Sequence, residues 1–94
     1  MEYRRTEELV SERGNPMNIV DLVDQMAKAL VDKPDKVTVH ELKGQNTSVI
    51  ELRVAKEDVG KVIGKKGRNA EALRTIIGAA AMKEHKTYVL EIID

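Results

Sequence analysis

Hydrophobic residues recur every three or four positions in three parts of the chain and at every second position in three others. A spacing of three or four is typical of an amphipathic helix, and a spacing of two is typical of a strand with one buried face. The chain has 94 residues, which is enough for one hydrophobic core and too few for two. The alternation between the two periods therefore predicts a single α+β domain.

Three helices are expected from residue 16 onward. The first runs from Pro16 to Val31, because Asn15 is a good N-cap and proline is tolerated at the first helical position. The second covers residues 56–63 and the third residues 68–84, with a four-residue loop between them. The expected buried positions are Ile19, Val23, Met26, Ala27 and Leu30 in the first helix and Ala70, Leu73, Ile76, Ile77 and Ala80 in the third.

Three strands are expected over residues 36–42, 47–54 and 87–93, where apolar and polar side chains alternate. The turn-forming run Gly44-Gln45-Asn46 lies between the first two and predicts a β-hairpin. The predicted order of elements from residue 16 onward is therefore α-β-β-α-α-β.

Basic charge is concentrated in one short stretch of an otherwise neutral chain. With 16 basic and 16 acidic residues the net charge is +0, which argues against an indiscriminate polyanion-binding protein. Residues 60–69 nevertheless contain four basic residues and no acidic one, namely Lys61, Lys65, Lys66 and Arg68. The chain has no cysteine and only two aromatic residues, so the sequence excludes disulfides, thiolate metal sites and an aromatic stacking platform.

The segment Gly64-Lys65-Lys66-Gly67 lies between the second and third expected helices. Because Gly64 and Gly67 lack Cβ atoms, a phosphodiester backbone can approach this loop within hydrogen-bonding distance. The third helix begins next to the loop, and its first free N–H groups and its dipole favour a phosphate there. The lysines add mobile positive charge. These features favour a phosphate backbone but do not distinguish one base from another.

Two glycines at this spacing are a weak signal by themselves. With six glycines in the chain such pairs arise by chance, and a tight helix-to-helix turn with solvated lysines explains the same residues. The context favours phosphate binding, because the loop precedes a helix inside a β-α-α-β unit and holds the densest basic cluster of the chain.

The run Val62-Ile63-Gly64-Lys65-Lys66-Gly67-Arg68 resembles the GxxG loop of KH domains, which clamps about four nucleotides of a single strand. The order α-β-β-α-α-β resembles the type II, or prokaryotic, KH domain, which implies a three-stranded sheet with helices packed on one face. From about Met17 to Asp94 the chain is similar to the small bacterial single-KH proteins of the KhpA family. Other stretches that carry this similarity are Ala29-Leu30-Val31-Asp32, Glu51-Leu52-Arg53-Val54, Gly60-Lys61-Val62-Ile63 and Ile92-Ile93-Asp94.

This resemblance implies a cytoplasmic protein that binds single-stranded RNA and acts as an RNA chaperone or a post-transcriptional regulator. It implies a homodimer, or a heterodimer with a second KH-containing, KhpB-like protein, and family members are linked to control of the cell envelope and of cell length. The alternative is a protein-interaction or dimerisation module that uses the KH fold for assembly and binds little RNA. The RNA-binding residues implied are Lys61, Ile63, Gly64, Lys65, Lys66, Gly67 and Arg68.

The bases are expected in a groove between the core helices and the edge of the strand Thr47–Val54. The candidates for its apolar floor are Val59, Val62, Ile63 and Ala70. Many KH domains carry a larger aliphatic residue at the position of Ala70, so we expect a shallow groove.

No catalytic residue, metal site or cofactor is expected. The run Gly60–Gly67 resembles a nucleotide-binding P-loop only superficially, because a lysine stands where a serine or threonine must hold magnesium. His40 and His85 are far apart and are interpreted as surface or capping residues. Glu57 and Asp58 stand in the first turn of a helix, where compensation of the helix dipole explains them without acid-base catalysis.

The KH domain is expected over residues 16–94 and an N-terminal extension over residues 1–15, with a short helix at Thr6–Arg13. The extension has no counterpart in the family pattern and is natural, the product of an early start codon, or added sequence. No apolar run has the length of a membrane span, so no membrane partner is expected. The small-residue run Gly78–Ala81 is interpreted as close packing inside the domain, with the approach of another helix as the alternative.

Overall fold

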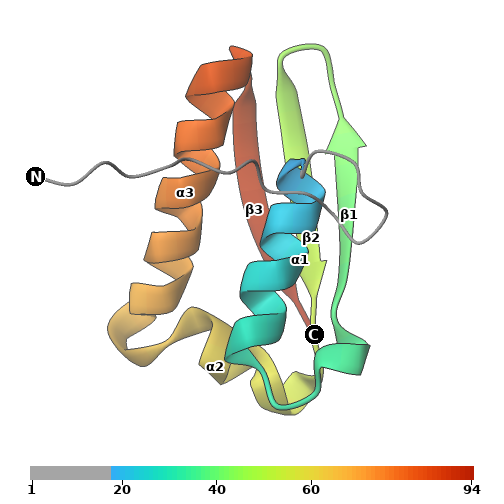
Figure 1. Ribbon diagram of the computed structural model, residues 1–94, viewed down its shortest axis with the longest axis vertical. Helices are drawn as coiled ribbons and strands as arrows, with labels where there is room; N and C mark the ends of the chain where they lie inside the picture. The colour runs from blue at the N-terminus through green and yellow to red at the C-terminus, as the bar shows by residue number, and fades with distance from the viewer. Residues whose placement is uncertain (1–17) are drawn as a thin grey trace, which may run out of the picture.

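The computed structural model describes residues 18–94, and Figure 1 shows one three-stranded sheet with the helices on one of its faces. The elements are α1 (Ile19–Leu30), β1 (Thr38–Lys43), β2 (Thr47–Arg53), α2 (Val59–Ile63), α3 (Arg68–Glu84) and β3 (Thr87–Ile93), with 3-10 turns at Pro34–Lys36, Lys56–Asp58 and Lys65–Gly67. The predicted α+β class and the predicted order α-β-β-α-α-β are confirmed. The helix expected at Thr6–Arg13 and the extension of residues 1–15 lie outside the described residues.

The first helix begins at Ile19, so the predicted start at Pro16 with Asn15 as N-cap is wrong. The cap is Asn18, whose side-chain oxygen accepts a hydrogen bond from the Asp21 N–H at 2.9 Å. Both asparagines are good N-caps, and the sequence alone does not decide between them. The helix ends at Leu30, one residue before the predicted end.

The sheet has the order β1-β2-β3, which makes β2 the central strand. The predicted hairpin is confirmed, since β1 and β2 are antiparallel and the Gly44 N–H donates to the Thr47 carbonyl at 2.8 Å. β2 and β3 are parallel, and the chain between them forms α2 and α3. β1 begins at Thr38 and not at residue 36, because Pro34–Lys36 closes into a 3-10 turn.

The hydrophobic core lies between the inner face of the sheet and the helices. β2 contributes Ile50, Leu52 and Val54, as predicted from its period of two. The other members of the buried cluster are Ile19, Val23, Ala27, Val37, Val62, Leu73, Ile77 and Leu90.

Part of the predicted inner face of α3 is wrong. Ile76 is 43% exposed, whereas the neighbouring Ile77 is 2% exposed and packs in the core. In the small-residue run, Ala81 is buried, but Gly78 and Ala79 are exposed. Successive helix positions are about 100° apart, so an apolar residue one position from the core stripe points to solvent.

The outer face of the sheet, which no described helix covers, carries an apolar row. Leu42 on β1, Val49 on β2 and Val89 on β3 are register partners and therefore lie side by side on this face. Leu42 is 54% exposed and Val89 is 44% exposed. The sheet thus presents one apolar strip to solvent.

The end of the inner face next to the hairpin is polar. Ser48 is buried there in register with Tyr88, whose hydroxyl donates to Glu84 Oε1 at 2.7 Å. Burial, with the hydrogen bond to Glu84 and the negative charges of Glu84 and Glu41, raises the pKa of Tyr88 to about 12.

This shift predicts a loss of stability in strong alkali. The unfolded chain releases the tyrosine proton near pH 10, whereas the folded protein keeps it to about 12. The folded state therefore binds more protons in this window, and the stability that depends on Tyr88 falls as the pH rises. Urea unfolding of the wild type and of Tyr88→Phe at pH 9 and pH 11 measures it, and the wild type should lose more stability. Equal losses in the two proteins would contradict the assignment.

Candidate nucleic-acid interface

The loop between α2 and α3, which we call the glycine loop (Gly64–Gly67), has an unusual backbone. Its φ angles are 79° at Gly64, 57° at Lys66 and 74° at Gly67, all in the left-handed region. The Gly67 N–H donates to the Gly64 carbonyl at 3.0 Å, which closes the loop on itself. The loop lies at the lower left of Figure 1, at the end of the molecule away from the hairpin.

Gly64 is required by its conformation and by its neighbour. A φ of 79° with a ψ of 171° is a region that only glycine visits readily. A Cβ atom here would lie 2.6 Å from Cγ and 2.8 Å from the backbone nitrogen of Asn69. The Asn69 side chain donates to the Lys61 carbonyl at 2.9 Å and so ties the start of α3 to α2. Asn69 was not among the predicted site residues, because an asparagine after the loop carries no distinct signal.

Gly67 faces open space, since a Cβ atom there would meet nothing within 4 Å. It is the N-cap residue of α3, and no side chain caps this helix end. The adjacent side chains of Lys65, Lys66 and Arg68 are exposed, and no ion pair within residues 18–94 involves them. The structure therefore combines an uncapped helix start, an unobstructed backbone and three unpaired cations at one place.

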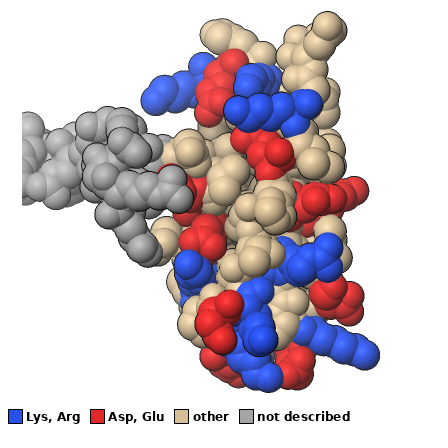
Figure 2. All heavy atoms as spheres, turned by 90° about the vertical axis from the view of Figure 1, so that its right-hand side faces the viewer, with Lys and Arg blue, Asp and Glu red and all other residues tan. Residues whose placement is uncertain are grey.

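On the side of the molecule next to β1 the charges are mixed. Figure 2 shows the side of the molecule that lies to the right in Figure 1, next to β1, and there basic and acidic side chains are interspersed. Such a face has no extended potential of one sign, so it does not attract a polyanion strongly.

A groove of about 620 Å³ runs from the glycine loop along α3 to the free edge of β3. Its lining residues are Ile63, Gly67, Ala70, Arg74, Leu90, Glu91, Ile92 and Ile93. The predicted groove along the edge of Thr47–Val54 is wrong, because β2 pairs on both sides and β3 forms the edge. Ile63 and Ala70 line the groove as expected, whereas Val62 is fully buried in the core and Val59 is not among the lining residues.

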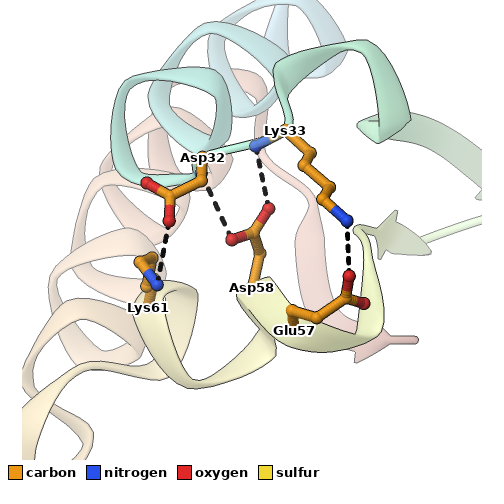
Figure 3. Close-up of polar contacts among 5 residues, drawn as sticks. All are labelled: Asp32, Lys33, Glu57, Asp58 and Lys61. Carbon is orange, nitrogen blue, oxygen red and sulfur yellow. Dashed lines mark hydrogen bonds and ion pairs between the residues drawn. The ribbon is translucent and has the colours of Figure 1, made fainter.

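Asp58 holds the end of α1 against the turn that precedes α2 (Figure 3). Its carboxylate accepts hydrogen bonds from the N–H of Asp32 at 3.2 Å and of Lys33 at 3.0 Å. Only 1% of Asp58 is exposed. We call this contact the Asp58 junction. The interpretation of Asp58 as a dipole-compensating residue missed it, because the partners are more than twenty positions away in the sequence.

Two exposed ion pairs flank the Asp58 junction (Figure 3). Lys33 Nζ contacts Glu57 Oε2, and this hydrogen bond, supported by the charge of the partner, raises the pKa of Lys33 and lowers the pKa of Glu57. Lys61 Nζ lies 3.2 Å from Asp32 Oδ2. Lys61, a predicted RNA-binding residue, is therefore already engaged by a carboxylate, in contrast to the cations of the glycine loop.

Six of the seven predicted site residues, Ile63–Arg68, lie together at one end of the molecule beside the groove. The seventh, Lys61, lies on α2 and pairs with Asp32. Arg74 and Glu91 also line the groove and were not predicted. Within the described residues there is no group of three potential metal ligands among His, Cys, Asp and Glu. None of the helices described between residues 18 and 94 is both long and apolar enough to span a membrane.

The chain is similar to known proteins over most of its length. Residues 20–92 match the family model described as KhpA/KhpB, KH domain. The chain is 58% identical over 73 residues to the RNA-binding protein KhpA of Caldanaerobacter subterraneus subsp. tengcongensis, covering 78% of this chain and 97% of that protein. It is 55% identical over 73 residues to the Clostridium perfringens RNA-binding protein KhpA, with the same coverage of 78% and 97%. The RNA-binding protein KhpA of Borreliella burgdorferi is 44% identical over 77 residues, covering 82% and 94%. No solved structure matches the chain.

Replacing Gly64 and Gly78 by alanine should have opposite effects on stability. Gly64→Ala places a side chain in a strained conformation against the Asn69 backbone, at a cost of about 1–3 kcal/mol for the strain alone. Gly78 is exposed in α3 with open space around its Cβ position, so Gly78→Ala should stabilise by about 0.5–1 kcal/mol. Urea unfolding measures both, and a Gly64→Ala protein as stable as the wild type would show that the loop conformation is not required.

Removing the carboxylate of Asp58 should destabilise the fold. Asp58→Ala leaves two N–H groups without their charged acceptor, and we expect a loss of about 2–3 kcal/mol. Asp58→Asn keeps one acceptor oxygen and should lose less. Glu57→Gln is the matched control, because it removes one solvent-exposed ion pair and should change stability far less. Equal effects of Asp58→Ala and Glu57→Gln in urea unfolding would overturn the role of the junction.

Proposed function

The chain belongs to the KhpA/KhpB family of KH domains, and from this premise we propose that it binds single-stranded RNA by holding the sugar-phosphate backbone at the glycine loop. Its three-stranded sheet with helices on one face is the type II KH fold. The observation that carries the proposal is the group of unpaired cations on a positive-φ loop at the uncapped start of α3.

The phosphate is held by backbone and side chains together. The first N–H groups of α3 and its positive dipole end point toward the loop, and an anion there stabilises them. Lys65, Lys66 and Arg68 neutralise the phosphate charge. Gly67 leaves the approach open because no Cβ stands in the way. Lys61 adds charge from α2 when it exchanges its Asp32 partner for phosphate.

The bases then enter the groove between α3 and the edge of β3. Ile63 and Ala70 give it an apolar surface, and the small Ala70 leaves it shallow. Among residues 18–94 no aromatic side chain lines the groove, so these residues do not supply the stacking energy of about 1–3 kcal/mol per base that aromatic residues give. One copy of the domain therefore binds weakly, and pairing with a second copy or with a KhpB-like KH protein raises the effective concentration of sites.

This weak, backbone-directed binding suits an RNA chaperone or a post-transcriptional regulator that acts on many RNAs without catalysing a reaction. The RNA-binding unit in this proposal is the KH domain of residues 16–94, and residues 1–15 are an extension to it.

A protein-assembly module is the second candidate, and the apolar row on the outer face of the sheet favours it. Leu42, Val49 and Val89 lie in register on the face opposite the helices. A module of this kind buries the row against a partner and binds that partner with little dependence on salt. RNA binding by phosphate neutralisation falls steeply with salt, so a salt titration separates the two functions.

Reversing the charge of the glycine loop should abolish RNA retention without unfolding the protein. In Lys65→Asp/Lys66→Asp two exposed cations become anions, and the thermal transition should survive because neither is buried. The control variant Lys36→Asp/Lys43→Asp makes the same charge change beside and within β1 and should keep its affinity. Filter binding of a single-stranded RNA at several salt concentrations is the measurement.

In the wild type, log K should fall with log salt at a slope of about −0.7 for each phosphate contact. A loop variant that binds as tightly as the wild type would remove the glycine loop from the mechanism. A flat salt response would favour the assembly function.

A further inference from the structure

Lys61 differs from the other basic residues of the proposed site because it has an acidic partner. Its Nζ lies 3.2 Å from Asp32 Oδ2, whereas in the described part of the chain no ion pair involves Lys65, Lys66 or Arg68. Water reaches both partners, since the side chain of Asp32 is 74% exposed and that of Lys61 is 47% exposed. A strand that binds at the glycine loop therefore meets the loop cations directly and Lys61 only in competition with a carboxylate.

We propose that Asp32 competes with the RNA strand for Lys61 and thereby sets how tightly the site binds. The inference rests on the proposed function, because it requires an RNA strand held at the glycine loop. It gives Asp32 an effect opposite to that of the loop residues: Asp32 weakens the binding of RNA, and the strand is released more easily.

The backbone places Lys61 beside the part of the site that faces the phosphate. The side chain of Asn69, in the first turn of α3, donates to the Lys61 carbonyl at 2.9 Å. The Gly64 N–H donates to the Gly60 carbonyl at 2.8 Å, so the last turn of α2 leads directly into the glycine loop. A lysine ammonium stands on a flexible four-carbon stem. Lys61 can therefore turn from Asp32 to a phosphate at the loop without any change in the backbone.

Asp32 is held in place by the Asp58 junction. Its N–H donates to the buried carboxylate of Asp58 at 3.2 Å, which fixes the backbone of Asp32 beside α2. Figure 3 shows the carboxylate of Asp32 directed at Lys61, on the opposite side of Asp58 from the pair of Lys33 and Glu57. The competing charge is thus a fixed part of the fold beside the RNA site.

The exchange of Asp32 for a phosphate gains little free energy. An exposed ion pair is weak because water and salt compete with it, so an RNA phosphate can displace Asp32. The phosphate then gives Lys61 the same kind of partner that it had before. The carboxylate that becomes free repels the phosphates next to it. Lys61 therefore contributes little affinity in the wild type, and it contributes fully only when the charge of Asp32 is removed.

Filter binding of a single-stranded uridine heptamer to the full chain measures this competition. Asp32→Asn should bind about two- to fivefold more tightly than the wild type, which corresponds to the strength of an exposed ion pair. The variant keeps the N–H that Asp58 accepts, so the fold should be retained. A variant that only damages the fold would lose affinity, whereas competition predicts a gain. Asp32→Glu keeps the charge and should bind as the wild type does.

A double-mutant cycle shows whether Asp32 acts through Lys61. In the Lys61→Gln background, Asp32→Asn should change the affinity little, because no ammonium is left to release. An equal gain with and without the lysine would show that Asp32 only repels RNA through its charge, and it would overturn the proposal. Glu57→Gln is the matched control, because it breaks the other exposed pair of Figure 3 and should leave the affinity nearly unchanged. A gain as large as that of Asp32→Asn would also count against the proposal.

The salt dependence of binding gives a second measurement. In the wild type, the contact that Lys61 makes with a phosphate is offset by the contact that it loses with Asp32. In Asp32→Asn the phosphate contact is an additional one, so the slope of log K against log salt should become steeper by about 0.7. A gain in affinity with an unchanged slope would contradict the release of Lys61.

The outcomes also separate this inference from the proposed function. Equal affinity of the wild type and Asp32→Asn, with binding still lost in Lys65→Asp/Lys66→Asp, overturns the competition and leaves the RNA-binding function standing. No binding of the heptamer by the wild type or by Asp32→Asn overturns both.

Discussion

The hydrogen bonds from two backbone N–H groups to the buried carboxylate of Asp58 are the constraint on which the rest of the structure depends. A helix of five residues, such as α2, is not stable by itself, because helix nucleation is costly and only long helices recover the cost. The Asp58 junction holds the turn before α2 against the end of α1, and Val62 anchors α2 in the core. Asn69 then ties α3 to the last turn of α2. The glycine loop is thus fixed on both sides, and its cations are presented by a rigid frame.

This frame separates two kinds of basic residue. Lys33 and Lys61 lie at the junction and form ion pairs with Glu57 and Asp32, whereas the three cations of the loop have no acidic partner in the described part of the chain. Exposed pairs contribute little to stability, but they cancel the local positive potential. The junction lysines therefore add little to the attraction for a polyanion, whereas the adjacent cations of the loop act together. A chain with a net charge of +0 can in this way attract phosphate at one place without binding nucleic acid over its whole surface.

A local pattern of residues contains the bounds of helices and strands but not the contacts between distant parts of the chain. Turn residues and the change of period placed α3 and β3 at their observed bounds, because both elements have clear ends. The same pattern did not reveal that β2 and β3 pair in parallel, so the groove was placed beside the wrong strand. The contacts of Asp58 and Asn69 were missed for a related reason. The partners of Asp58 are distant in the chain. The acceptor of Asn69 is a backbone carbonyl, which every residue has, so the type of the partner residue gives no signal. Ile76 was misplaced because an apolar residue beside the core stripe looks the same whether it is buried or exposed.

The described part of the chain places no aromatic residue in the groove, and this determines how the site can discriminate among strands. Stacking is tolerant of sequence because every base has a π-face, so a site built on stacking gains affinity without selectivity. Here the lining offers a shallow apolar surface and one exposed cation, Arg74, and a charge-assisted hydrogen bond depends on the direction of its donors. A base without a matching acceptor leaves Arg74 in water, which costs little for an exposed side chain, so discrimination in a single copy is modest. Backbone binding at the loop and base reading in the groove are then additive and physically separate, and either one can weaken without loss of the fold.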